Sequence, residues 1–249
     1  MKKVLYLGSA NLHYQQMPEV DEHIKELFRK CEVEYIVLPN EKHCVEGLYP
    51  LGFKELARKE AIQFYEEVKD MDIEAIVTPY GASQSMWTNV YPDEFGLKLD
   101  VPFYNVTQFF YLKAMELDVQ FDPLPMKLAM HDGCTVGRKL GVVKEPRELL
   151  KKIPELQLVE QQHPSIGIDG TTPADWSTCP GAWLNMTIPE LADEVEKNFI
   201  EKNIMPLQVD AVTTDCANAL FGIRMGIMKG NYPLKSYFFT DIINMVWRA

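Results

Sequence analysis

The stretch 131–138, which reads His-Asp-Gly-Cys-Thr-Val-Gly-Arg, follows a short apolar run and carries a cysteine beside a turn. Two later cysteines lie in similar settings, at 179–181 (Cys-Pro-Gly) and at 214–216 (Thr-Asp-Cys). In sheets of parallel strands, binding sites form beyond the carboxyl ends of the strands. We therefore expect Cys134, Cys179 and Cys216 to converge at one end of a parallel sheet.

Apolar runs and amphipathic segments alternate along the chain on both sides of this stretch. We expect strands at 3–7, 33–38, 73–78, 127–131, 156–161 and 209–213, and helices at 19–30, 53–71, 108–115, 146–152, 189–202, 217–228 and 238–247. A mixed loop is expected between 84 and 101, and the basic run 147–152 has the pattern of a solvated helix face. Strands that alternate with helices predict an α/β fold with parallel sheets and right-handed crossovers.

The two halves of the chain correspond to each other. Residues 74–80 (Glu-Ala-Ile-Val-Thr-Pro-Tyr) align without a gap with residues 210–216 (Asp-Ala-Val-Thr-Thr-Asp-Cys), and 106–110 align with 239–243. This similarity indicates an internal duplication with a period of about 120–130 residues. We expect two pseudo-symmetric repeated domains, 1–118 and 119–249, with their cysteine loops meeting at the domain interface.

Composition excludes several classes of protein. The 249 residues carry a net charge of −11, which argues against nucleic acid as a partner because such binding depends on clustered Lys and Arg. The apolar segment 4–7 is too short for a signal peptide, and no run approaches the roughly 18 apolar residues of a membrane span, so we expect a cytoplasmic protein. The five irregularly spaced cysteines favour metal or redox ligands over a disulfide framework.

The cysteine positions carry a family resemblance. The matching positions are Ser9, His43, Cys44, Tyr80 and Ser83 in the first half and Cys134, Cys179, Pro180, Cys216 and Ala219 in the second. Thirty-five residues separate Cys44 from Tyr80, and thirty-five separate Pro180 from Cys216. This pattern resembles the cysteine-rich CCG domain in the B-type chain of heterodisulfide reductase, in which a cysteine, a cysteine pair and a C-x-x-C motif occur twice.

The resemblance implies iron–sulfur chemistry, with departures. In that family each complete motif supplies five cysteines to a noncubane cluster. The first half here keeps only Cys44, which is read as a relic, while the second half keeps Cys134, Cys179 and Cys216. The resemblance therefore implies a [4Fe–4S] cluster with three cysteine ligands, ranked above the noncubane form and above zinc. His131 is a candidate additional ligand, or a residue that braces its turn by a hydrogen bond; other candidates are Asp132, Asp215 and His163.

The function implied is that of a redox subunit in a heterodisulfide reductase-like complex. It would transfer electrons to or from a thiol, disulfide or sulfane-sulfur substrate, with a ferredoxin-like C-type subunit, a flavoprotein A-type subunit and an intact B-type paralogue as partners. An alternative is a cofactor-free scaffold subunit of such a complex, which would expose an apolar surface at 238–247 or 109–111. A third hypothesis is a small-molecule binding module that uses the vacated first site around Ser9, His43 and Tyr80.

Overall fold

The chain folds into two four-stranded parallel sheets. The computed structural model describes residues 3–8, 16–39, 41, 48–161, 184–186 and 188–248. The first sheet holds β1 (Lys3–Tyr6), β2 (Tyr35–Ile36), β3 (Ile73–Thr78) and β4 (Phe103–Asn105), in the order β2-β1-β3-β4. The second holds β5 (Met126–His131), β6 (Leu156–Val159), β7 (Ala211–Thr214) and β8 (Lys235–Phe238), in the order β6-β5-β7-β8. The equivalent strand orders confirm the α/β fold with two repeated units.

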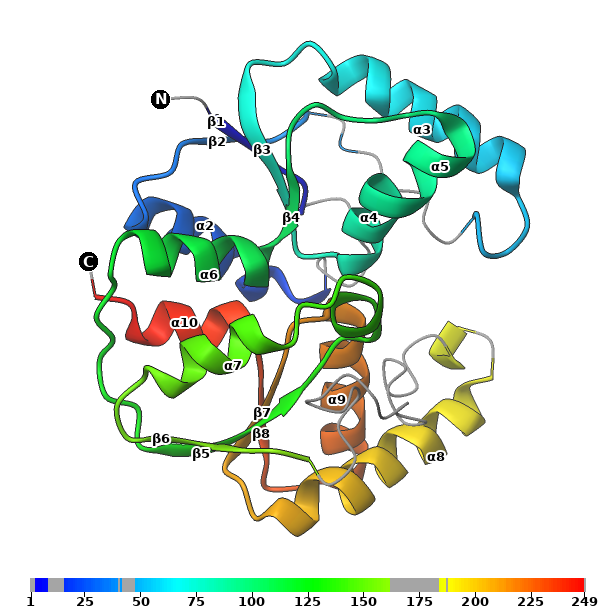
Figure 1. Ribbon diagram of the computed structural model, residues 1–249. Helices are drawn as coiled ribbons and strands as arrows, with labels where there is room; N and C mark the ends of the chain where they lie inside the picture. Colours follow the sequence, from blue (N-terminus) through cyan, green and yellow to red (C-terminus); the bar gives the residue numbers. More distant parts are fainter. Residues whose placement is uncertain are drawn as a thin grey trace.

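Four helices fill the layer between the two sheets (Figure 1). They are α2 (Pro18–Lys30), α6 (Val106–Glu116), α7 (Lys144–Lys151) and α10 (Phe239–Val246). Contacts join α10 to α2 and α6 to α7, so each pair links one half of the chain to the other. The inner layer is therefore shared by the two repeats.

One apolar core runs through this inner layer. The inward faces of both sheets contribute to it, with Val4 and Tyr6 from β1 and Leu128 and Met130 from β5. Phe28 of α2 lies near its centre, in contact with the rings of Tyr6, Tyr35, Phe109 and Phe110. Alternate strand residues point to opposite faces of a sheet, so the next residues along β1 and β5 face outward.

The outward faces carry separate, smaller cores. Outside the first sheet lie α3 (Lys54–Val68) and α5 (Tyr91–Phe95), which follows α4 (Gly81–Ser85) and a π-helical turn (Met86–Val90). Outside the second sheet lie α8 (Pro189–Phe199), a π-helical turn (Ile200–Ile204) and α9 (Ala217–Gly230). Shorter helical segments occur at Thr135–Lys139, Leu184–Met186 and Met205–Leu207.

Several details differ from the sequence predictions. The region expected to be a mixed loop contains the end of α4, the π-helical turn and α5, because Trp87 and Tyr91 are buried in the outer core of the first half. The short strands β4 and β8 were not expected. The segments 238–247 and 109–111, which the scaffold alternative would expose as an apolar surface, instead supply Phe109, Phe110 and Trp247 to the inner core, so that expectation of the alternative was wrong. Among the described residues, no helix is long and apolar enough to cross a membrane.

Candidate functional site

A cavity of about 390 Å³ lies where the two halves meet at the carboxyl ends of their strands. The first half contributes two residues from the turn before α3, Tyr49 and Pro50, and residues from the end of β3 and the helical segments after it: Pro79, Tyr80, Gly81, Ala82, Ser85, Met86 and Val90. The second half contributes residues after β5 and β7: Cys134, Thr135, Val136, Lys139, Cys216, Ala217 and Asn218. Both Cys134 and Cys216 are partly exposed. Two of the three predicted ligands therefore share one cavity.

Strand pairing explains this convergence. In the parallel register of β5 and β7, His131 pairs with Thr214, so the two strands end side by side. The turns that carry Cys134 and Cys216 then leave the sheet at neighbouring positions. Gly133 and Asp215 are 82 positions apart in the sequence. The pairing of β5 with β7 brings them together as hydrogen-bonded neighbours.

The same local turn follows the third strand of each repeat. The Cys216 N–H donates to the Thr214 hydroxyl at 3.3 Å, and the Tyr80 N–H donates to the Thr78 hydroxyl at 3.2 Å. A threonine hydroxyl commonly stabilises a turn by such a hydrogen bond to the backbone two residues on. Tyr80 thus occupies in the first half the position that Cys216 occupies in the second, and both residues line the cavity.

Glycine allows the turns around the cavity to pack closely. A Cβ atom at Gly133 would lie 2.7 Å from the Cys216 Cβ and 2.8 Å from the Asp215 Oδ1, closer than packed atoms tolerate. A Cβ atom at Gly81 would overlap the side chain of Val136, which belongs to the other half. Gly133 therefore allows the Cys134 turn to pack against the Cys216 turn, and Gly81 allows it to pack against the first half.

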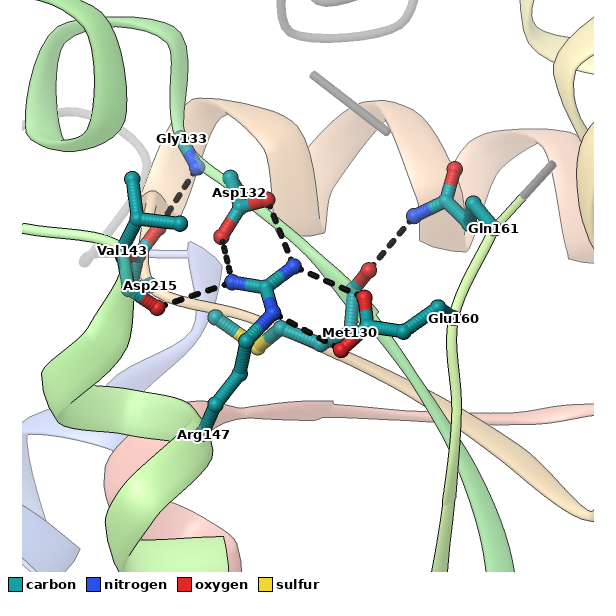
Figure 2. A network of polar contacts seen from close by, with 8 residues as sticks. All are labelled: Met130, Asp132, Gly133, Val143, Arg147, Glu160, Gln161 and Asp215. Atoms are coloured by element: carbon teal, nitrogen blue, oxygen red, sulfur yellow. Dashed lines mark hydrogen bonds and ion pairs between the residues drawn. The ribbon is translucent and has the colours of Figure 1, made fainter. Parts of the chain in front are cut away.

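A buried ion-pair cluster around Arg147 lies next to Gly133, just after β5 (Figure 2). Arg147 of α7 donates two hydrogen bonds to Asp132, at 2.6 and 2.9 Å, and two to Glu160, at 2.8 and 2.9 Å. A fifth bond, at 2.9 Å, goes to the Val143 carbonyl. All five guanidinium N–H donors are therefore satisfied. The run 147–152 was expected on a solvated helix face; Glu148, Lys151 and Lys152 are exposed, but the 4% exposure of Arg147 shows that the interpretation was wrong for this residue.

Asp215 connects the two thiol-bearing turns. Its Oδ1 accepts a hydrogen bond from the Gly133 N–H at 2.6 Å, and its side chain is fully buried. Burial, with a further contribution from the nearby Asp132 carboxylate, raises the pKa of Asp215 to about 8. The carboxyl group is consequently mostly protonated at neutral pH.

His131 lies apart from the cavity lining. Its ring packs edge-on against Phe199 at the end of α8, with 4.9 Å between ring centroids, and burial lowers its pKa to about 4. The imidazole is therefore neutral near pH 7. Its predicted role as a ligand stays a prediction, because the structure places the ring in the outer core of the second half and not on the described wall of the cavity.

The remaining cysteines divide into two groups. Cys31 is buried in the inner core, and this burial raises the pKa of its thiol to about 12, as suits a small apolar residue. Cys44 and Cys179 lie outside the described residues, as do Ser9, His43 and His163. Within the described part of the chain, no three His, Cys, Asp or Glu side chains form a metal-binding group.

The donor chemistry of the cavity suits a thiolate-ligated centre. The side chains of Cys134 and Cys216 are sulfur donors, whereas the carboxyl groups of Asp132 and Asp215 are bound to Arg147 and to the Gly133 N–H. Iron–sulfur clusters take cysteine thiolates as ligands. Cys134 and Cys216 therefore fit as two members of such a ligand set.

Sequence reasoning missed two parts of this arrangement. Arg147 was read as one of several basic residues, although it lies three positions before the buried Leu150 and so shares the apolar face of α7. Lys139, the one charged residue among the described cavity-lining residues, was also missed. No local pattern distinguishes it from the other surface lysines.

Comparisons with known proteins agree with the fold and the cysteine pattern. The family model of the cysteine-rich domain, CCG, matches residues 5–82 and 128–223, well over half of the chain. An uncharacterised iron–sulfur protein of Methanocaldococcus jannaschii is 24% identical over 86% of this chain and 40% of its own length. The B chain of the fumarate reductase (CoM/CoB) of Methanothermobacter marburgensis is 32% identical over 52% of this chain and 24% of its own length.

The chain spans less than half the length of these two curated relatives. Among solved structures, the aspartate racemase of Picrophilus torridus aligns with 98% of this chain and 91% of its own, at 10% identity and a TM-score of 0.44. The family match, by contrast, covers each repeat from its first strand to the turn or helix after its third. The chain belongs to the cysteine-rich CCG domain family.

Proposed function

We propose that this chain is an iron–sulfur oxidoreductase subunit of the heterodisulfide reductase-like kind. The observation that carries the proposal is the placement of Cys134 and Cys216, from two different strand ends, on one cavity between the repeats. The iron–sulfur character named for the Methanocaldococcus jannaschii relative supports a cluster at these thiols. Cys179, at the first position of the motif's cysteine pair, is the proposed third ligand.

The residues of the chain would have distinct tasks at this site. Cys134, Cys179 and Cys216 would hold a [4Fe–4S] cluster, which accepts and donates single electrons when bound. Met86, Val136 and Ala217 give the cavity an apolar lining that limits the access of water. Tyr80 stands in the first repeat where the second repeat has Cys216. The first repeat would therefore line the site without holding a second cluster.

The proposed substrate is a thiol, a disulfide or a sulfane-sulfur compound that reaches the cavity. The name of the Methanothermobacter marburgensis relative, one chain of a fumarate reductase (CoM/CoB), supports a sulfur substrate and a multisubunit setting. The proposed partners are a ferredoxin-like C-type subunit, a flavoprotein A-type subunit and an intact B-type paralogue. The boundaries 1–118 and 119–249 remain our proposal for the two repeats.

The test is to measure iron and acid-labile sulfide per chain, with a visible spectrum, in protein purified without oxygen. We expect about four irons per chain and an absorption band that is lost in Cys134→Ser and in Cys216→Ser. Cys31→Ala is the matched control, because it removes a thiol from the core and should leave the iron content unchanged. An iron-free wild-type protein after anaerobic purification and iron–sulfur reconstitution would overturn the proposal.

A further inference from the structure

We propose that Asp215 and the Arg147 cluster (Arg147, Asp132 and Glu160) position the Cys134 and Cys216 thiols before any metal binds. The chain would then present a preformed two-thiol site. The proposal rests on the proposed function only for the identity of the natural occupant. Asp215 and Arg147 would act as positioning residues, since neither lines the cavity itself.

The Asp215 hydrogen bond joins the two thiol-bearing turns directly. Asp215 immediately precedes Cys216, and Gly133 immediately precedes Cys134, so the 2.6 Å bond between Asp215 Oδ1 and the Gly133 N–H links the neighbours of both thiols. The absence of a side chain at Gly133 permits this contact, because a Cβ atom there would clash with Asp215 and Cys216. The separation of the two thiols is therefore set by a buried bond and by close packing.

The Arg147 cluster holds the Cys134 turn from its other side. Asp132 lies two residues before Cys134, and both of its carboxylate oxygens accept hydrogen bonds from Arg147. Arg147 belongs to α7 and is bound in turn to Glu160 and to the Val143 carbonyl. A planar guanidinium with all five donors engaged has little freedom to rotate, so it anchors Asp132 in one orientation.

The buried ion pair between Arg147 and Asp132 need not stabilise the fold, but it does fix the orientation of the groups that it joins. Replacing a complete buried ion pair by apolar residues is often neutral or stabilising, because desolvation offsets the attraction between the charges. Their placement directly behind one ligand turn is therefore better explained by orientation. Groups that contact ligand residues without touching the metal commonly alter metal affinity by about 10- to 100-fold.

The same strand pair contains a matched control. Asp210 precedes β7, and its Oδ2 accepts a hydrogen bond from the Lys127 N–H of β5 at 2.7 Å. Asp215 follows β7 and bonds the chain just after β5. The two aspartates thus accept similar backbone bonds at opposite ends of β5 and β7, an exposed one at Asp210 and a buried one at Asp215, and only Asp215 adjoins the thiols.

The experiment uses the full chain with Cys44→Ser and Cys179→Ser, reduced and freed of iron with a chelator. Cys134, Cys216 and the buried Cys31 are then its only thiols. The probe is phenylarsine oxide, whose arsenic forms two As–S bonds while the two thiol protons leave with its oxygen as one water. No electrons are transferred, so the binding constant reports how readily two thiols meet one atom. Circular dichroism confirms that each variant is folded.

We expect one tightly bound arsenical per chain in this background. Asp215→Ala should weaken binding about 10- to 100-fold. Asp215→Asn, which keeps an oxygen to accept from the Gly133 N–H, and Asp210→Ala should both stay close to the background. If Asp215→Ala does not fold, the double variant Asp132→Asn with Arg147→Met removes the cluster without leaving a buried charge, and it should also weaken binding.

Three results would overturn the positioning role: no chelation in the background, unchanged affinity in both Asp215→Ala and the double variant, or equal weakening by Asp210→Ala. Failure of the two proposals can be told apart. Asp215-dependent chelation in a protein that never takes up iron would refute the cluster and leave the positioning intact. Iron uptake together with Asp215-independent chelation would do the reverse.

Discussion

At the scale of single residues, His131 shows how burial changes the chemistry of a side chain. Its pKa is lowered to about 4 by burial against Phe199 and its neighbours, while an unfolded chain would protonate it below about 6.5. Between these values the unfolded state binds more protons, so lower pH favours unfolding. We predict that folded stability falls as the pH drops from about 6.5 towards 4, and that His131→Gln removes this part of the fall.

Urea unfolding at a series of pH values checks this prediction. Above pH 7 the free energies of wild type and His131→Gln should differ by a constant offset, which serves as an internal control because neither folded nor unfolded histidine is charged there. A pH-independent difference between the two proteins from pH 7 down to pH 4 would contradict the assigned burial.

At the scale of elements, Arg147 adds polar contacts with the second sheet to the apolar contacts that Leu149 and Leu150 of α7 make in the inner core. Arg147 reaches from α7 to Asp132 after β5 and to Glu160 after β6. Arg147→Met would leave the Asp132 carboxylate buried with its main partner gone, and we predict a loss of about 3–5 kcal/mol in unfolding free energy. Adding Asp132→Asn should recover part of the loss, because the uncompensated charge is then removed.

Urea unfolding of the single and double variants measures this coupling. Glu160 is the less critical partner, since its side chain is 29% exposed and can be solvated when Arg147 is removed. Equal stabilities of the single and double variants would show that Asp132 carries no uncompensated charge and would count against the ion-pair description.

At the scale of the whole molecule, one inner core joins the two repeats. Phe28 contacts Phe109 and Phe110, and the cluster around it extends to Phe238, Ile242 and Trp247 of the second half. We predict that Phe28→Ala costs about 3–5 kcal/mol and lowers the unfolding midpoints of both halves together. Variants that keep only Trp87 or only Trp247 as fluorophore report on the first and second half.

Coincident transitions in these two single-tryptophan proteins are the expected result, because a shared core couples the halves. A shift confined to the Trp87 signal would show that the repeats unfold independently. It would also mean that the contacts of α10 with α2 and of α6 with α7 contribute little to stability.

Local patterning predicted much of this architecture. The strand at 73–78 and the helix near 18–30 were visible as an apolar run and an amphipathic stripe, both signals that depend on neighbouring residues alone. Comparison of the two halves predicted the repeat, and the parallel strand order implied that Cys134 and Cys216 would meet. The strands β4 and β8 escaped notice because each runs directly into a helix, α6 or α10, without turn residues to mark its end.

The sequence by itself determined the α/β class, the duplication and the convergence of two thiols, because periodicity and spacing encode strand and helix order. Only the tertiary structure decided which charges are buried. Arg147 resembles its solvated neighbours in sequence, and its burial follows from carboxylates that β5 and β6 bring to it from Asp132 and Glu160. The hydrogen bond between Asp215 and Gly133 likewise depends on the register of β5 and β7. Register belongs to the pair of strands and cannot be read from either segment alone.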